Sequence, residues 1–370
     1  MAGGGILGTW HALELCRAGF TVAHLEADAA PQGASVRNFG LIWVSGRHTG
    51  SELDAALRAR QRWEEVSADI GGIGFRPSGS LTLATTDGER KVMEEFAAHP
   101  DAAARSISYV DPDEVVALNP AVRGEVAGGL HCTRDAIVEP RRALGALRDY
   151  LAARSDPGSY AFHSGRRVHG VEDHALVDTA GTRWEADLIV LATGAGFDHL
   201  PGTEGVGARV RRVRLQMLET EPFAGVLTTA LADADTLRYY PAYAVVPQDL
   251  LGPQSPVAAT HHLQLLLVQR ADGGLTIGDT HAYDEPFDFA LVEDPSLELL
   301  GRAERLLGAA PPPVARRWEG VYAQSTDGAV CAREELSPDV WMVTGPGGRG
   351  MTCAPAIAAD TLVASGVSLT

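Results

Sequence analysis

Gly3-Gly4-Gly5-Ile6-Leu7-Gly8 has the G-x-G-x-x-G spacing of a turn that cradles a pyrophosphate. A helical pattern of apolar residues follows and stops near Gly19, and residues 20–25 then form a predicted buried strand that ends at Glu26. In such a unit the first glycine permits a tight turn, the second admits the phosphates and the third lets the helix pack closely on the sheet. Glu26 stands where a carboxylate accepts hydrogen bonds from ribose hydroxyls. The sequence therefore predicts a dinucleotide site.

This motif requires a β-strand before its first glycine, and only Met1 and Ala2 precede Gly3. The missing strand would lie in the middle of a parallel sheet. Three explanations are open: a start codon upstream of Met1, a shortened chain, or another segment in the place of the strand. We favour the upstream start, which predicts that a longer chain folds better or binds more cofactor.

Composition narrows the class of protein. The chain has 370 residues, 45% of them hydrophobic and 21% charged, which is enough material for two domains with buried cores. The net charge of −17 argues against a nucleic-acid partner, because a polyanion is repelled. No apolar run is long enough for a membrane span and no secretion signal begins the chain, so we expect a cytoplasmic protein. The four cysteines and twelve histidines show no metal-ligand spacing, so no metal is expected.

A second strand–loop–helix unit is predicted at the end of the chain. Residues 340–344 form an apolar strand, residues 345–352 a glycine-rich loop, and a helix is expected from near Pro355 to Gly366. The continuous apolar run at 187–191, which leads into a glycine turn, is typical of a strand buried in a parallel sheet. Between these units, residues 209–320 are rich in strand patterns, including one at 262–268.

Three segments together resemble one superfamily of flavoproteins. They are Gly3–Gly8 with Glu26, Gly33-Ala34-Ser35-Val36-Arg37-Asn38-Phe39-Gly40, and Gly347-Gly348-Arg349-Gly350-Met351-Thr352. Their order and spacing resemble the D-amino-acid oxidase, glycine oxidase and sarcosine oxidase superfamily, over essentially the whole chain. Within it, residues 35–40, 275–281 and 317–322 are similar to a subgroup associated with phosphonate breakdown.

The resemblance implies an α/β fold with two parts. A Rossmann-like FAD-binding domain would comprise residues 1–75, 140–205 and 320–370. A discontinuous substrate-binding domain of the α+β type, with a mainly antiparallel sheet, would comprise residues 76–139 and 206–319. The FAD-binding residues that the resemblance implies are Gly3, Gly5, Ile6, Leu7, Gly8, Glu26, Ala27, Ser35, Arg37, Asn38, Phe39, Gly40, Val168, Ala192, Gly194, Gly348, Arg349, Gly350, Met351 and Thr352.

The sequence departs from the superfamily pattern at three points. Tyr322 stands where an arginine clamps the substrate carboxylate in glycine and D-amino-acid oxidases. The cysteine that links flavin covalently in sarcosine oxidases is absent near Tyr322-Ala323-Gln324, so we expect non-covalent FAD. Thr276 takes the place of a lysine thought to promote reaction with oxygen, which leaves open whether the electron acceptor is oxygen or another molecule.

The resemblance implies oxidation of a primary or secondary amine. A hydride would pass from the carbon next to nitrogen to the flavin, and the imine would then hydrolyse. We expect a small anionic amine such as an N-alkylated 2-aminoethylphosphonate. Because the flavin performs the chemistry, no catalytic side chain is assigned. The substrate-binding candidates are Arg47, Tyr240, His261, His281, Tyr322 and Arg349, although ion pairing or core packing would also explain most of them.

Three other functions fit parts of the sequence. A glycine or sarcosine type of amino-acid oxidase would share the fold. A nicotinamide-dependent dehydrogenase would share the glycine-rich turn, although the loop at 347–352 and Arg37-Asn38 argue against it. A catalytically impaired flavoprotein is a third alternative, which the missing first strand suggests.

Overall fold

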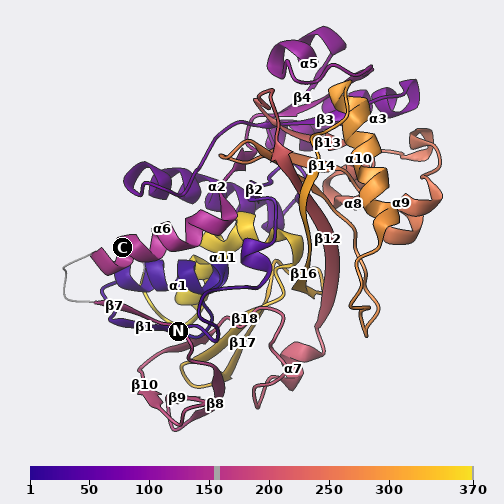
Figure 1. The fold of residues 1–370 in the computed structure, drawn as a ribbon. Helices are drawn as coiled ribbons and strands as arrows, with labels where there is room; N and C mark the ends of the chain where they lie inside the picture. The colour runs from indigo at the N-terminus through magenta and orange to yellow at the C-terminus, as the bar shows by residue number, and fades with distance from the viewer. Residues whose placement is uncertain (154–158, 369–370) are drawn as a thin grey trace.

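The computed structural model describes residues 1–153 and 159–368, and it has two halves that are each built around a sheet (Figure 1). The first half holds a mainly parallel sheet and the second a larger, mainly antiparallel sheet. This arrangement confirms the predicted mixed α/β fold class.

The parallel sheet has the first glycine-rich turn at its centre. Its order is β7, β1, the segment 1–3, β11, β18 and β17, and only β17 is antiparallel to its neighbour. The strands are β1 (Val22–Leu25), β7 (Tyr160–His163), β11 (Ile189–Leu191), β17 (Ala332–Ser337) and β18 (Val340–Thr344).

Met1, Ala2 and Gly3 lie where the motif requires a strand. The Ala2 amide donates to the Val190 carbonyl at 2.9 Å, and the Gly3 amide donates to the Leu25 carbonyl at 2.8 Å. Ala2 thereby bridges β1 and β11 in parallel. The residues just before the turn therefore join the two parts of the sheet.

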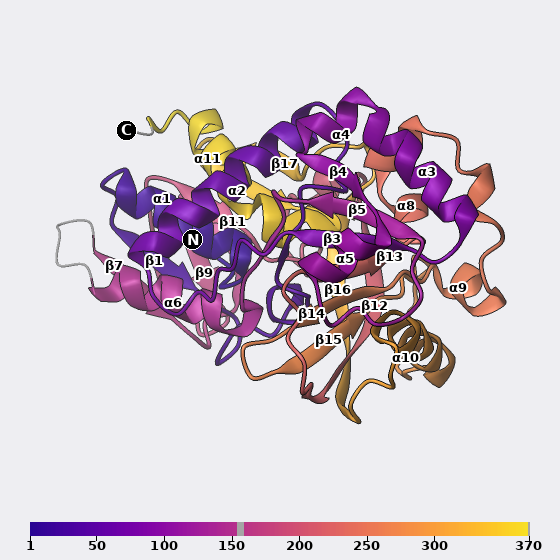
Figure 2. The same cartoon turned by 90° about the horizontal axis from the view of Figure 1, so that it is seen from above.

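Four helices cover one face of this sheet: α1 (Ile6–Arg17), α2 (Ser51–Asp69), α6 (Pro140–Ala153) and α11 (Gly350–Ala364). Figures 1 and 2 both show α1 beside α6 and α11. Trp10 and Trp63 meet edge to face in the shared core, with ring centroids 4.8 Å apart. The other face carries the predicted hairpin region as a small sheet of β8 (Val168–Glu172), β9 (Ala175–Asp178) and β10 (Arg183–Glu185). No helix within residues 1–153 and 159–368 is long and apolar enough to cross a membrane.

Helix α11 begins at Gly350 and not near Pro355 as predicted. Proline inside a helix removes an amide donor, which frees the carbonyl four residues earlier. That carbonyl belongs to Met351, and the Trp63 indole N–H donates to it at 3.0 Å. A side chain from α2 thus satisfies the acceptor that Pro355 leaves open, so the helix can start directly after the glycine-rich loop.

The second sheet has eight strands in the order β16, β12, β15, β14, β13, β3, β5 and β4, and only the β13–β3 pair is parallel. Its strands are β3 (Ser80–Ala84), β4 (Ile107–Val110), β5 (Gly128–Cys132), β12 (Val210–Pro222), β13 (Ala230–Asp233), β14 (Leu266–Gln269), β15 (Gly274–Gly278) and β16 (Val314–Ser325).

One face of this second sheet packs on α10 (Glu293–Leu307) and α9 (Pro256–His261), as the view from above shows (Figure 2). The opposite face presents Leu215, Met217 and Tyr322 to the first half, where they meet Phe39 and Trp43. The remaining elements are α3 (Asp87–Ala98), α4 (Pro100–Ala104), α5 (Pro112–Leu118), α7 (Glu204–Gly207), α8 (Thr236–Tyr239), β2 (Leu41–Ile42) and β6 (Ala136–Ile137).

The strand predicted at 262–268 is shorter than expected. Ser255 caps helix α9 through its hydroxyl, which accepts from the Ala258 amide at 3.0 Å, and Pro256 opens the helix. His262 then ends the helix in the left-handed region, with φ of 44°. Only the end of the predicted segment is extended, in β14. Strand β16 also crosses the domain boundary predicted at residue 320, and the division into two domains stays a prediction.

Acid should weaken this fold through two buried histidines beneath the glycine-rich turn. Burial lowers the pKa of His24 to about 3 and that of His11 to about 4. His24 lies between the Gly3 carbonyl, at 2.8 Å from Nε2, and the Tyr160 hydroxyl, at 2.9 Å from Nδ1. The unfolded chain binds protons below about pH 6.5, whereas the folded chain does not until the pH is far lower. Stability is therefore present above pH 6.5 and falls by about 2 kcal/mol per histidine at about pH 5.

Urea unfolding between pH 7.5 and pH 5 would measure this slope. Replacing His24→Gln should flatten it, whatever the change in stability at neutral pH. Replacing the exposed His48→Gln should leave it unchanged. Equal slopes in the wild type and in His24→Gln would contradict the assignment.

Candidate active site

A cavity of about 730 Å³ lies between the two halves and is lined by both. From the first half it takes the glycine-rich turn, segments between residues 31 and 52, and the loop at 346–351. From the second it takes residues of β12, β14, β16 and α8. This volume is typical of a site for a cofactor or a small ligand.

The glycine-rich turn fits a pyrophosphate because its backbone passes closely over its neighbours. Gly3 has φ of +105°, and a Cβ there would collide with the Ala192 carbonyl oxygen. A Cβ on Gly8 would collide with the Gly3 carbonyl oxygen. Gly5, the N-cap residue of helix α1, has no side chain to cap the helix, and the N-terminus of α1 faces the cavity, where its amide groups attract an anion.

Glu26 lines the cavity at the end of β1, where it was predicted. Its Oε2 accepts from the Gly4 amide at 2.7 Å and its Oε1 from the Asp28 amide at 3.0 Å. These two backbone donors fix the carboxylate in place. Each oxygen keeps a further lone pair that can accept from a ribose hydroxyl.

Asn38 and Ser35 hold the next segment against the turn. The Asn38 amide donates to the Ala34 carbonyl at 2.8 Å, and its Oδ1 accepts from the Gly40 amide at 2.7 Å. The Ser35 hydroxyl accepts from the Ile6 amide, at the start of α1. Arg37 donates to the Glu319 carbonyl at 3.0 Å and so reaches across to the second half.

Most of the predicted residues lie together around this cavity. Its lining includes Gly3, Gly5, Ile6, Leu7, Glu26, Ala27, Ser35, Arg37, Asn38, Phe39, Arg47, Val168, Ala192, Gly194, Tyr240, His281, Tyr322, Gly348, Arg349, Gly350 and Met351.

Four predicted site residues lie outside the lining, for packing reasons. Gly8 packs α1 on the turn, and Gly40, with φ of +69°, avoids a collision with the Val138 carbonyl. The Thr352 hydroxyl accepts from the Trp43 amide at 2.9 Å and joins α11 to the first half. His261 ends α9, where its carbonyl accepts from the His281 amide at 2.9 Å. Its position does not support a role in substrate binding.

Arg349 reaches the cavity, but its side chain is already engaged. It donates from Nη1 to Glu52 Oε2 at 2.9 Å and from Nε to the Pro346 carbonyl at 3.0 Å. The backbone of residues 348–351 lines the cavity here, where α11 starts without a side-chain cap. Such a helix start stabilises negative charge.

Arg47 pairs with the other oxygen of the Glu52 carboxylate. Its Nη1 lies 3.5 Å from Glu52 Oε1, its Nε donates to the Trp43 carbonyl, and its side chain is buried. The guanidinium carbon lies 5.4 Å from the ring centroid of Tyr240. The cluster of Arg47, Arg349 and Glu52 therefore carries one positive charge in excess.

The C-terminal end of α8 brings two tyrosines to the same end of the cavity: Tyr239, the last residue of the helix, and Tyr240, directly after it. Tyr239 stacks on His281, with centroids 4.3 Å apart, and meets Tyr240 edge to face. Burial raises the pKa of Tyr240, so its phenol stays neutral. Tyr322, from β16, completes the aromatic wall.

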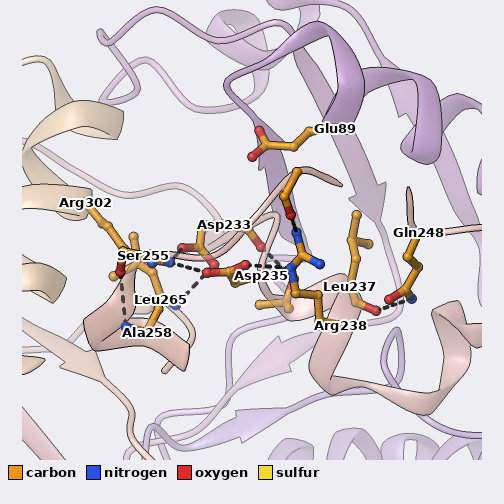
Figure 3. Close-up of polar contacts among 12 residues, drawn as sticks. Glu89, Asp233, Asp235, Leu237, Arg238, Gln248, Ser255, Ala258, Leu265 and Arg302 are labelled. Atoms are coloured by element: carbon orange, nitrogen blue, oxygen red, sulfur yellow. Dashed lines mark hydrogen bonds and ion pairs between the residues drawn. The ribbon is translucent and has the colours of Figure 1, made fainter. Parts of the chain in front are cut away.

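An ion-pair cluster beside the cavity fixes α8 (Figure 3). Arg302, on α10, donates from Nη1 to Asp233 and to Asp235, at 2.6 Å each. Asp235 also accepts from Arg238 Nε at 3.0 Å, and Arg238 lines the cavity. The charges hold the pKa of Arg302 above its ordinary value, although burial opposes this. The cluster therefore ties the start of α8 to the outer helix α10.

The polar lining residues that sequence reasoning did not single out include Glu52, Gln264 and Asp279. Glu52 was hidden in an ordinary helix pattern. Asp279 stands inside the stretch 275–281, two residues before His281. It was not predicted as a site residue because an isolated acidic residue forms no recognisable motif. Thr276, in contrast, is buried in β15 outside the lining.

In the part of the chain that the structure describes, the side chains form neither a metal site nor a cysteine attachment site in the cavity. This part contains no group of His, Cys, Asp and Glu side chains arranged for a metal ion. The four cysteines are buried outside the cavity lining, so none is placed to form a covalent bond with a ligand there.

Comparison with known proteins identifies the family. A model of the FAD dependent oxidoreductase family, DAO, matches residues 2–362. The chain belongs to this family. FAD is therefore its cofactor, and the protein is a flavin oxidoreductase. The glycine turn, the fixed Glu26 carboxylate and the two helix N-termini along one cavity fit this group.

Individual relatives are distant. One component of the opine oxidase of Rhizobium meliloti is 26% identical over 235 residues, which cover 60% of this chain and 62% of that protein. Its counterpart in Agrobacterium tumefaciens is 24% identical over 384 residues, covering 98% and 92%. The solved structure of glycine oxidase from Geobacillus kaustophilus is similar with a TM-score of 0.76 at 21% identity, covering 100% of this chain and 97% of that one.

The close packing at Gly8 gives a direct test of the cofactor site. Gly8→Ala forces a methyl group against the Gly3 carbonyl and His24, so it should lower the melting temperature and the FAD content of the purified protein. Gly145→Ala is the matched control, because the added methyl group on α6 meets no atom within 4 Å. The control should keep its FAD and gain up to about 1 kcal/mol of stability. Full FAD retention in Gly8→Ala would contradict the assignment.

Proposed function

We propose that this protein oxidises a small anionic amine with FAD. The proposed substrate class is an N-alkylated 2-aminoethylphosphonate. The observation that carries the proposal is the positive excess of Arg47 and Arg349 over Glu52 beside the aromatic wall. In a chain with a net charge of −17, a buried positive charge in the cavity is a specific feature that attracts an anionic head group.

Tyr322 supports a head group other than the α-carboxylate of an ordinary amino acid. The resemblance places Tyr322 where amino-acid oxidases of the superfamily carry an arginine, and the structure puts this tyrosine in the cavity lining. A neutral phenol cannot form the bidentate pair that a guanidinium forms with a carboxylate. The resemblance of residues 35–40, 275–281 and 317–322 to the phosphonate subgroup points the same way.

The chain's own residues would mainly bind and orient the substrate. Arg47 would hold the anionic end, while Tyr239, Tyr240 and Tyr322 would enclose the amine and exclude water. When bound, FAD supplies the acceptor for a hydride from the carbon next to nitrogen. The substrate nitrogen gives up its ammonium proton before the hydride leaves. Loss of the hydride from the neutral amine leaves an iminium ion, which water converts to an aldehyde, an amine and a proton.

An anaerobic absorption spectrum tests the substrate class. Adding N-methyl-2-aminoethylphosphonate to the FAD-loaded protein should bleach the flavin band, and adding glycine should not. Bleaching by glycine alone would favour an amino-acid oxidase. Bleaching by neither compound would contradict the proposed substrate and would leave an impaired flavoprotein as the better description.

Arg47→Gln tests the anion site. Glu52 keeps its ion pair with Arg349 in this variant, so the fold should survive. The loss of a charged partner should raise KM for the anionic amine by about ten- to hundredfold. Arg58→Gln is the control, since Arg58 forms an exposed ion pair with Asp360 at 2.8 Å and should leave KM unchanged. An unchanged KM in Arg47→Gln would show that Arg47 does not hold the head group.

A further inference from the structure

Asp279 places a carboxylate without a strong cationic partner inside the cavity. Its side chain is buried, and it lines the same end of the cavity as Tyr240 and His281. Among residues 1–153 and 159–368, no arginine or lysine lies within ion-pair distance of it. Its side-chain contacts are the Gln264 amide, at 3.4 Å from Oδ1, and the His281 ring.

The backbone fixes Asp279 at this position. The Asp279 amide donates to the Gln264 carbonyl at 2.9 Å, and the Gln264 amide donates back to the Asp279 carbonyl at 3.2 Å. The Gln264 Oε1 is buried without a hydrogen-bond partner in the structure. The carboxylate therefore stands on a rigid base beside a further unsatisfied acceptor.

If the His281 ring is neutral, it does not balance the negative charge of this carboxylate. Its Nδ1 lies 3.0 Å from the His262 carbonyl, which only accepts, so the network assigns the ring proton to Nδ1. Nε2 of the neutral ring is then an acceptor, and it faces Asp279 Oδ2 at 3.9 Å. Either a proton on Nε2 or a cationic donor from a ligand would satisfy both acceptors.

Four tyrosine rings lie in the same cavity as this carboxylate, and two of them, Tyr239 and Tyr283, stack with the His281 ring that faces it. Burial first, and the Asp279 charge in addition, raise the pKa of Tyr239, Tyr240, Tyr283 and Tyr322. All four tyrosines line the cavity. Aromatic faces beside a carboxylate are the environment that alkylammonium groups prefer.

We propose that Asp279 binds the charged nitrogen of the substrate, within a cage formed by Tyr239, Tyr240, Tyr283 and Tyr322. This inference rests on the proposed function and adds a binding group for the positively charged end of the substrate. Arg47 would take the anionic end and Asp279 the cationic end, with Tyr240 between them, because Tyr240 contacts Arg47 and responds to the charge of Asp279. Burial raises the pKa of Asp279, which is the cost that a bound cation would offset.

A pair of non-reacting ligands tests this charge recognition. N,N,N-trimethyl-2-aminoethylphosphonate carries a permanent cation, and 3,3-dimethylbutylphosphonate has the same shape without the charge. Calorimetry on the FAD-loaded protein should show tighter binding of the cation by the wild type. Asp279→Asn should reduce this preference by about tenfold or more, because it keeps the shape of the side chain and removes its charge.

Asp284→Asn is the matched control, because it removes an equal charge from an exposed position outside the cavity lining. It should keep the preference, and Asp279→Glu should recover part of it. A wild type that binds both ligands equally would overturn the inference, even if no Asp279 variant folds. An undiminished preference in folded Asp279→Asn would do the same.

The two proposals fail separately. If the wild type prefers neither ligand but N-methyl-2-aminoethylphosphonate still bleaches its flavin, the role of Asp279 is wrong and the proposed function stands. If neither phosphonate binds and the flavin is not bleached, the substrate class is wrong as well.

Discussion

The close passage of the Gly3–Gly8 turn over the strand ends is the constraint on which the rest of the structure depends. Gly3 and Gly8 have no space for a side chain. Their close packing on neighbouring backbone places the start of α1 at the ends of the sheet strands. The same turn is supported from below by the neutral His24. Because the turn is fixed, Glu26, Ala192 and the second loop at 347–350 open on one cavity. The second half then needs only to close that cavity with a sheet face and α8.

Buried ion pairs fix the side chains at the end of the cavity next to α8. Burying an arginine costs free energy unless a carboxylate accompanies it, and Glu52 serves both Arg47 and Arg349. The cluster of Arg302, Asp233 and Asp235 holds the tyrosines of α8 from outside. This end of the cavity therefore holds a net positive cluster around Glu52 and, separately, a negative group, Asp279, among aromatic rings. This pattern fits a ligand with both charges better than it fits a simple apolar amine.

Sequence patterns predicted the parts of the site that depend on local backbone geometry. The glycine spacing, the acid at the end of β1 and the second strand–loop–helix unit each follow from short-range rules, and the family match confirms the fold and the cofactor. Contacts between distant segments were not predictable in this way. The indole of Trp63 supplies the partner that lets α11 start before Pro355, and Glu52 captures Arg349 from almost 300 residues away. His261 lies at the end of α9 and outside the cavity lining, a position that follows from the packing of α9 and not from a local sequence pattern.

The central claim is that a carbon next to the substrate nitrogen loses a hydride in this cavity. Anaerobic stopped-flow reduction with N-methyl-2-aminoethylphosphonate, deuterated at chosen carbons, measures this most directly. The account predicts slower flavin reduction when deuterium replaces hydrogen on a carbon bonded to nitrogen, and no change when it is placed on the carbon bonded to phosphorus. Reduction that is insensitive to deuterium on both carbons bonded to nitrogen would contradict it.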